Sequence, residues 1–330
     1  MKKNAFFALI AILSVITFAG CVRRPVWRTM DGSVWRTTYH IVYRYDRQLD
    51  DSVIGVLNRI DASLSPFNRG SIVSAVNRGD TSTRADSHFR KVFAASRAVW
   101  EASDGRFDPT LGPAITLWGF GPGHDTATVT DACVDSVRAL VGIGECAVDR
   151  DGRVTKKQEG TQFNFSAIAK GYACDEVGAM LRRNGVADYL VEIGGEIALA
   201  GVNDRGKPWR VMVDAPVAGA PQRHERLTTI ELGAGGVATS GNYRNYRDIA
   251  GEGRVGHTIL PSTCRPAPQR LLSVTVTASD CMTADALATA CMTADTTEAR
   301  MLMERFPGAG CLIVCGDSTV VTYGKFPRMI

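Results

Sequence analysis

The segment "DYLVEIGGEIALAGV", residues 188–202, constrains the fold more than any other, because it predicts two β-strands joined by a glycine turn. Strands joined by so short a turn pair as antiparallel neighbours. Other short runs also alternate apolar and polar residues, and they predict further strands. These strands are expected at residues 37–45, 161–166, 208–216, 227–233 and 271–279, with hairpins at 146–157 and 310–324.

Helices are predicted between the strands, but they are fewer. Since the strands outnumber the helices and pair largely with their sequence neighbours, we predict an α+β fold rather than a doubly wound parallel sheet. Residues 235–247 are predicted to form a loop that is entered from a strand. Helical spacing of apolar residues predicts helices at 51–67, 87–103, 130–142 and 167–185, and a further helix after Ser279 or Asp280.

The N-terminus predicts export. A cationic start, "MKK", precedes the apolar run "AFFALIAILSVITFA", which is too short for a comfortable membrane span and is followed by "GC". This pattern resembles a bacterial lipoprotein signal, so we predict a signal peptide at residues 1–20, a lipid anchor on Cys21 and a tether at 21–31. An ordinary secretory signal and an uncleaved anchor are the alternatives. All three place residues 32–330, predicted as one catalytic unit, on the periplasmic side, with the inner membrane preferred.

Charge and cysteine content exclude some classes of function. The formal net charge of +4 becomes +4 − 2 = +2 without Lys2 and Lys3, so nothing indicates a nucleic-acid partner. Of nine cysteines, eight follow Cys21, with no CxxC motif and no Cys/His cluster at zinc spacing. We interpret them as small buried side chains, with one or two disulfides left open.

The pentapeptide "CMTAD" occurs twice, at 281–285 and at 291–295. In the first copy, Asp285 and Thr289 are i and i+4 on one helical face. A carboxylate and a hydroxyl so placed can coordinate a hard cation such as Mg²⁺. A capping or solvated aspartate is the alternative interpretation.

The second copy predicts a different role. Asp295 is ten residues further on and leaves the face that carries Asp285. It is followed by "TTEA", which predicts the N-cap of a new helix with Glu298 in the capping-box position. The repeat therefore predicts one functional aspartate and one structural aspartate.

Two other stretches carry candidate residues. In "FNFSAIAKGYACDEV", residues 163–177, Lys170 lies at a predicted helix start, where it can add a point charge to a bound diphosphate. In "GHTILPSTCRP", residues 256–266, His257 is a candidate general base. Each could instead be a surface lysine or a structural histidine.

The order of the motifs is more specific than any of them alone. "FDPTLGPAITLWGFG", "SAIAKGYACDEV", "GGEIALAG", "HTILP" and "MTADALATA" follow one another along the chain. This order resembles the ApbE-type FAD:protein FMN transferase family, and the resemblance covers roughly residues 32–325. It implies an α+β, ApbE-like fold related to the T-fold, with mixed, mainly antiparallel sheets flanked by helices.

The resemblance also implies a reaction. Family members are exported, often as lipoproteins, and use FAD as substrate with Mg²⁺. They transfer FMN to a Thr or Ser hydroxyl of a partner redox protein through a phosphoester bond and release AMP. Mg²⁺-dependent hydrolysis of FAD to FMN and AMP, a flavin-binding lipoprotein without catalysis and a structural lipoprotein without a ligand are the alternatives.

The resemblance assigns site residues by motif position. Mg²⁺ would be held by Asp285, Thr289 and the backbone carbonyl of Ala167, and His257 and Asp285 would be catalytic. Aromatic side chains among the flavin contacts would suit stacking on a ring system. The FAD contacts would be Trp35, Phe67, Arg106, Phe107, Asp108, Asn164, Lys170, Ile259 and Ala288.

The chain departs from the family pattern at several positions. The family usually has Met-Gly-Thr where this chain has Trp35-Arg36-Thr37, an aspartate at Asn164, and an Asp and a Gly at Leu260 and Cys264. Asn164 removes a negative charge beside the predicted metal, which should weaken metal binding. Because Asp285, Thr289, Lys170 and His257 are retained, we predict a diverged but active member.

Overall fold

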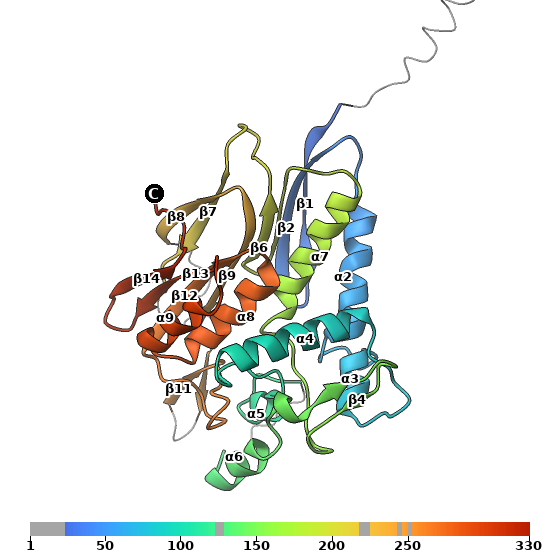
Figure 1. The fold of residues 1–330 in the computed structure, drawn as a ribbon, viewed down its shortest axis with the longest axis vertical. Helices are drawn as coiled ribbons and strands as arrows, with labels where there is room; N and C mark the ends of the chain where they lie inside the picture. Colours follow the sequence, from blue (N-terminus) through green and yellow to red (C-terminus); the bar gives the residue numbers. More distant parts are fainter. Residues whose placement is uncertain (1–23, 123–128, 218–224, 243–245, 250–252) are drawn as a thin grey trace, which may run out of the picture.

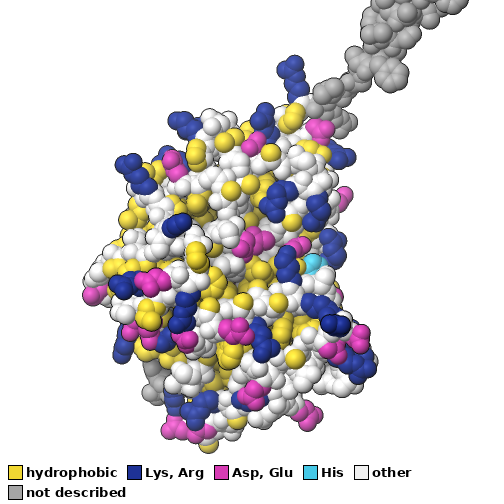
Figure 2. Space-filling view, in the orientation of Figure 1, with side chains coloured by type: hydrophobic (Ala, Val, Ile, Leu, Met, Phe, Trp, Pro, Cys, Tyr) yellow, Lys and Arg dark blue, Asp and Glu magenta, His cyan; other side chains and the backbone are white. Residues whose placement is uncertain are grey.

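A computed structural model describes residues 24–122, 129–217, 225–242, 246–249 and 253–330. The predicted signal peptide and Cys21 lie outside this part of the chain. Within it, no helix has both the length and the apolar character needed to cross a membrane. On the face shown in Figure 2, acidic and basic side chains are interspersed, in agreement with the nearly balanced charge.

The α+β prediction is confirmed. In the described chain, eight strands form one sheet, and every hydrogen-bonded pair in it is antiparallel. The predicted glycine hairpin lies inside this sheet as β5 and β6. The sheet order is β1 (Val26–Val34), β2 (Thr37–Tyr45), β5 (Tyr189–Ile193), β6 (Glu196–Ala200), β9 (Ala234–Gly241), β12 (Leu271–Ala278), β13 (Gly310–Cys315) and β14 (Val320–Gly324).

Side chains alternate along each strand, so each strand contributes residues to both faces of the sheet, and each face has its own apolar core. In β6, Ala198 faces the large core under the helices, whereas Leu199 packs with Trp209 and Ile230 of a separate hairpin. That hairpin comprises β7 (Trp209–Asp214) and β8 (Arg226–Leu232). The helices on the main core are α2 (Asp50–Leu64), α4 (Ser87–Ala102), α7 (Ala169–Arg183) and α8 (Cys281–Met292) (Figure 1).

Smaller elements lie at the lower end of the molecule in Figure 1 or flank the sheet. Leu111, Trp118 and Ile259 form the centre of a second apolar cluster at the lower end. These elements are α3 (Ile72–Asn77), α5 (Gly112–Leu117), α6 (Asp131–Arg138), η1 (Ile143–Glu145), α9 (Thr296–Glu304), β3 (Ala147–Val148), β4 (Val154–Thr155), β10 (Tyr246–Ile249) and β11 (Gly253–Gly256).

Two secondary-structure predictions were wrong. Residues 161–166 form no strand beyond a single bridge at Gln162, and Phe163 and Phe165 instead pack against Phe89 of α4. The segment 235–247, predicted as a loop, begins with a central strand, β9. Its glycines disfavour a strand by propensity, but α8 passes so closely that a Cβ at Gly236 would lie 2.3 Å from the backbone of Cys281.

The first strand of the sheet, β1, and its hairpin with β2 were not predicted. β1 begins at Val26, so it occupies the last six residues, 26–31, of the segment assigned to the tether. Trp35 and Arg36 form the turn to β2, and both have positive φ, 50° and 64°. Such a turn, with two left-handed residues, matches the twist of an antiparallel hairpin, but it normally contains Asn or Gly. Because the turn contains neither Asn nor Gly, the sequence did not indicate the hairpin.

The cysteines within the described residues are free thiols, so none of the disulfides left open by the sequence forms there. Cys311 and Cys315 lie in β13, as predicted. Cys174, Cys281, Cys291 and Cys311 are buried, which agrees with their interpretation as small core side chains.

Candidate active site

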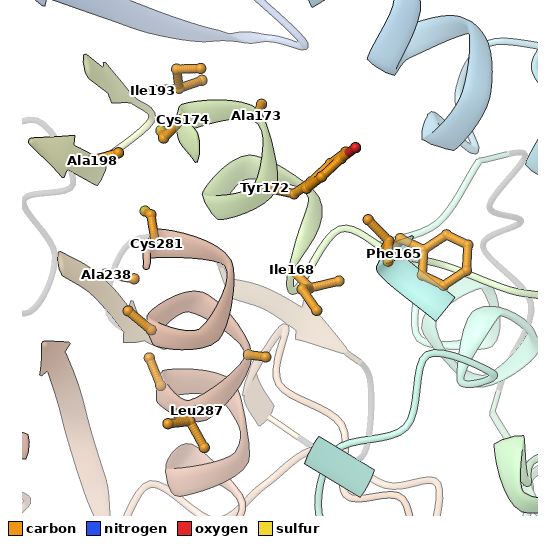
Figure 3. Close-up of a cluster of buried hydrophobic side chains, with 14 of the residues drawn as sticks. Phe165, Ile168, Tyr172, Ala173, Cys174, Ile193, Ala198, Ala238, Cys281 and Leu287 are labelled. Carbon is orange, nitrogen blue, oxygen red and sulfur yellow. The ribbon is translucent and has the colours of Figure 1, made fainter. Parts of the chain in front are cut away.

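The site is built where α7 and α8 cross. The two helices approach so closely that a Cβ at Gly171 would lie 2.3 Å from the carbonyl oxygen of Cys281. Figure 3 shows two small side chains near this contact, Cys174 on α7 and Cys281 on α8, with Ala238 of β9 beside Cys281. Small residues at the crossing therefore bring two helix N-termini together.

Each helix caps the other. The first residues of α7 have no side-chain cap from Ile168, and the Gly171 N–H instead donates to Asp285 Oδ2 of α8 at 3.0 Å. In return, Asp175 of α7 accepts from the backbone N–H groups of Cys281 and Met282, at 3.0 and 2.8 Å. Carboxylates near helix N-termini are favourable because the exposed N–H groups and the helix dipole carry partial positive charge. The reciprocal capping fixes the position of Asp285.

Asp280 completes the N-terminus of α8. Its carboxylate accepts from the Thr283 N–H at 2.8 Å, so of the two predicted N-caps, Asp280 is the one observed. Burial raises the pKa of Asp175 to about 6, against its two backbone hydrogen bonds, and the nearby Asp280 charge adds to the rise.

Lys170 lies between two buried carboxylates. Its Nζ is 2.9 Å from Glu196 Oε1 of β6 and 3.9 Å from Asp285 Oδ2. The Glu196 and Asp285 side chains are only 5% and 3% exposed, whereas Lys170 is 30% exposed. The lysine therefore has access to solvent, and a bound anion could reach it.

The electrostatics of this cluster follow from burial and charge. Burial raises the pKa of Glu196 to about 8, although Lys170 opposes the rise, and the Asp285 charge adds to it. Burial also raises the pKa of Asp285, opposed by Lys170 and the Gly171 N–H. For Lys170, burial acts to lower the pKa, but attraction to Asp285 and Glu196 outweighs it, and the pKa is raised. Two carboxylates thus share one ammonium group.

Two oxygen donors for a cation, Asp285 and Thr289, lie on the same face of α8. Asp285 is buried, and Thr289 Oγ1 lies one helical turn on, 3.3 Å from Ser240 Oγ of β9. Ala167, two residues before α7, is half-buried against the same core. In the described chain, no group of three His, Cys, Asp or Glu side chains could hold a metal. A cation here would therefore depend on hydroxyl and backbone oxygens beside Asp285, a set that suits Mg²⁺.

Arg106 docks against the far end of α8. Its Nη1 donates to the Thr293 carbonyl at 3.1 Å, and the Thr293 hydroxyl donates back to the Arg106 carbonyl at 2.9 Å. Its Nη2 pairs with Glu298 of α9. The adjacent Phe107 is buried in the main core. The structure thus connects the "GRFDP" segment to the helix that carries Asp285.

Asp108 and Asn164 have structural partners. Asp108 is buried, and its carboxylate accepts from the Thr110 N–H and hydroxyl and from the Ile143 N–H, at 2.8, 2.5 and 3.1 Å. Asn164 donates its N–H to the Pro109 carbonyl at 2.7 Å and accepts from the Ser166 N–H through Oδ1 at 3.0 Å. The carboxylate of Asp108 therefore holds the loop, and the two predicted contact segments lie side by side.

The remaining predicted contacts lie around this centre. Ala288 is buried in α8, and Ile259 is buried in the second cluster with Trp118. Trp35 packs against the main core, with its indole N–H buried and unpartnered. A Cβ at Gly194 would meet the Thr37 side chain at 3.0 Å and Lys170 Cδ at 3.4 Å, so the turn that carries Trp35 approaches the lysine.

Phe67 and His257 are more peripheral. Phe67 is 51% exposed in the turn between α2 and α3, and no contact joins it to the Lys170 cluster among the described residues. His257 follows β11 and makes an edge contact with Phe120, with ring centroids 6.3 Å apart. Trp118, two residues before Phe120, donates to the Cys264 carbonyl at 2.7 Å. The "LWGFG" and "HTILPSTC" motifs are therefore in contact.

Glu196 and Asp175 were not predicted as site residues. Both belong to motifs that the sequence singled out, "GGEIALAG" and "IAKGYACDEV". The available signal was a charged residue inside an otherwise apolar run, because buried charges in proteins are normally paired. The partners that pair with them come from other elements, which local sequence does not indicate.

Known proteins share this architecture. A model of the ApbE family matches residues 35–313. The FAD:protein FMN transferase of Vibrio cholerae is 33% identical over 290 residues, 85% of each chain. That of Haemophilus influenzae is 30% identical over 334 residues, 97% of this chain and 96% of the relative. The structure of the flavin transferase ApbE from Vibrio cholerae has a TM-score of 0.79 at 30% identity, covering 91% of this chain and 97% of that one.

Proposed function

The chain belongs to the ApbE family, and we propose that it is an FAD:protein FMN transferase. In the proposed reaction, the hydroxyl oxygen of a Thr or Ser on an acceptor protein forms a bond to the phosphorus of the FMN half of FAD. The P–O bond to the adenylate breaks, AMP leaves, and the hydroxyl proton passes to a base. The observation that carries this proposal is the pairing of Lys170 with Asp285 at the α7/α8 crossing, with Thr289 one helical turn further along α8.

The residues of the site suit phosphoryl transfer, which depends mainly on positioning and on neutralising charge. Lys170 is held in the first turn of α7, where a diphosphate would meet both its ammonium group and the positive end of the helix. Trp35 and Phe67 supply aromatic surface for a ring system. His257 is the proposed base for the acceptor hydroxyl, and its contact with Phe120 orients the ring.

We propose Mg²⁺ as the cofactor, held by Asp285, Thr289 and the Ala167 carbonyl. The buried Oε2 of Glu196 has no hydrogen-bond partner, so Lys170 leaves one polar oxygen of the pocket unsatisfied. When bound, Mg²⁺ would supply charge neutralisation at the diphosphate. The residues fit an oxygen-coordinated metal, and Asn164 in place of the usual aspartate would weaken the site.

We also propose that the protein is exported and anchored through a lipid on Cys21. The N-terminal sequence supports this proposal, and β1 begins at Val26. Only residues 22–25 would then separate the lipidated cysteine from the sheet, so the enzyme would work close to the membrane. A redox subunit at the membrane is the acceptor class that such a short tether suits.

The test uses the chain without residues 1–21, incubated with FAD and Mg²⁺, with and without a flavin-acceptor domain. AMP release is measured together with the intact mass of the acceptor. We expect AMP and an acceptor that gains one FMN. AMP with free FMN and an unmodified acceptor would indicate an FAD hydrolase, and intact bound FAD would indicate a binding protein without catalysis.

A further inference from the structure

Lys170 is not equidistant from its two carboxylates. Its Nζ is within hydrogen-bond distance of Glu196 Oε1, at 2.9 Å, but lies 3.9 Å from Asp285 Oδ2. We propose that Glu196 is a positioning residue that holds the Lys170 ammonium off Asp285 and so keeps the Asp285 carboxylate available to a divalent cation. The inference rests on the proposed metal-dependent function and adds a residue that the predicted site did not contain.

The position of Glu196 is fixed by its surroundings. It is the first residue of β6, directly after the Gly194-Gly195 turn, and its side chain is 5% exposed. A Cβ at Gly194 would lie 3.4 Å from Lys170 Cδ, so the lysine passes beside the turn that precedes Glu196. Burial of a carboxylate with one unpartnered oxygen is unfavourable for folding. The ion pair with Lys170 is the contact that offsets this cost.

The position of the ammonium group explains the role of Glu196. With Glu196 present, Lys170 Nζ lies 2.9 Å from Glu196 Oε1 and 3.9 Å from Asp285 Oδ2, so the ammonium group is held outside hydrogen-bond distance of Asp285. Without Glu196, Lys170 and Asp285 would form a neutral pair, because no other carboxylate is hydrogen-bonded to Lys170 among the described residues. A direct ion pair to Asp285 would then compete with the metal for the same oxygens. Glu196 therefore acts on the cation through Lys170.

The experiment measures Mn²⁺ binding to the FAD-free protein by isothermal titration calorimetry, with Mn²⁺ as the probe. Glu196→Gln removes the charge with little change in volume, and Glu196→Asp withdraws the carboxylate by one methylene and serves if the Gln variant does not fold. We expect the Kd for Mn²⁺ to rise about 10- to 100-fold, the usual effect of removing a partner of a metal ligand. The Mg²⁺ concentration for half-maximal activity should rise in parallel, with kcat at saturating Mg²⁺ little changed.

Glu192→Gln is the matched control. Glu192 lies in β5, just before the Gly194-Gly195 turn, and its Oε1 accepts from the Gly195 N–H at 2.6 Å. This variant removes one carboxylate charge nearby without removing a Lys170 partner, and it should leave the Kd for Mn²⁺ unchanged. A Kd raised equally by both substitutions would overturn the proposal, because the effect would then be one of overall charge.

The Lys170→Met variant tests whether Glu196 acts on the cation through Lys170. In Lys170→Met, adding Glu196→Gln should change the Kd for Mn²⁺ by no more than about twofold, the scatter expected between independent sites. A full loss of affinity in that background would show that Glu196 does not act through Lys170. Wild-type affinity in Glu196→Gln would overturn the positioning role while leaving the metal site intact. Absence of Mn²⁺ binding to the wild-type protein would overturn both this inference and the proposed metal.

Discussion

Asp285 and Asp295 occupy identical pentapeptides, and their replacement should have opposite consequences for activity and stability. Asp295 is the N-cap of α9, where its side chain accepts from the Glu298 N–H at 2.9 Å and Glu298 returns a bond to the Asp295 N–H at 2.8 Å. Asp285 is buried between the N-terminus of α7 and the Lys170 ammonium. The same pentapeptide therefore supplies a helix N-cap at Asp295 and a candidate metal ligand at Asp285.

The two substitutions should differ widely in their effects on stability and on activity. Asp295→Ala removes one capping bond, which costs about 1 kcal/mol of unfolding free energy. The Arg106 pair should survive, because Glu298 retains its own carboxylate. Asp285→Asn removes a charge that the proposed metal requires. Metal stabilisation of a transferring phosphoryl group is worth several kcal/mol, and each ~1.4 kcal/mol is a factor of ten, so we expect a loss of about 10³-fold in kcat/KM.

The assay is Mg²⁺-dependent AMP release from FAD, measured on both variants beside urea unfolding. Asp295→Ala should retain wild-type turnover with a lower urea midpoint. Asp285→Asn should lose turnover while remaining folded, since the amide oxygen can still accept from the Gly171 N–H. Equal loss of turnover in both variants would refute the assignment of separate roles, and so would full activity in Asp285→Asn.

Three further predictions follow from individual residues. His257→Ala should slow transfer by about 10²- to 10⁴-fold and change FAD affinity little, and loss of flavin binding would contradict its role as base. Arg36→Gly should raise the unfolding free energy by about 0.5–1 kcal/mol in urea titrations, because a left-handed φ of 64° is strained for arginine, whereas a loss of stability would contradict this account. The pKa of Asp175 is raised to about 6 in the folded protein, above its pKa in the unfolded chain. Its contribution to stability is therefore complete below the unfolded pKa and is lost as the pH rises through the folded pKa. Relative to Asp175→Asn, wild-type stability should therefore fall between about pH 4 and pH 7, by up to ~3 kcal/mol, and parallel pH profiles would refute the shift.

Local patterns predicted most of the fold because they act within one element. Alternation along 37–45 and the glycine turn in 188–202 gave strands that the structure confirms. The failures came from tertiary contacts. Gly235 and Gly236 indicate a loop by propensity, but the end of β12 approaches Gly235 and the start of α8 approaches Gly236 too closely for a side chain. Phe163 and Phe165 have β propensity, but packing against Phe89 left them outside the sheet.

Tertiary contacts also limit how much of the site the sequence predicts. Asp285 and Thr289 could be chosen from spacing, since residues i and i+4 share a helical face, and Lys170 could be chosen from its place at a predicted helix start. Glu196 could not, because its role depends on β6 bringing it to the first turn of α7, and no periodicity links residues 26 positions apart, at 170 and 196. The metal itself remains a prediction from the oxygen donors present.

Two departures from the family pattern lie at strained backbone positions. Arg36 and Cys264 stand where the family usually has glycine, and both have positive φ, 64° and 54°. Each residue therefore adopts the left-handed conformation that glycine permits, at a cost of about 1–2 kcal/mol. The exposed turn at Arg36 lies near Lys170, and the buried Cys264 accepts the Trp118 indole hydrogen bond. A strained backbone at both positions argues that these loops require the left-handed conformation even where the residue is not glycine.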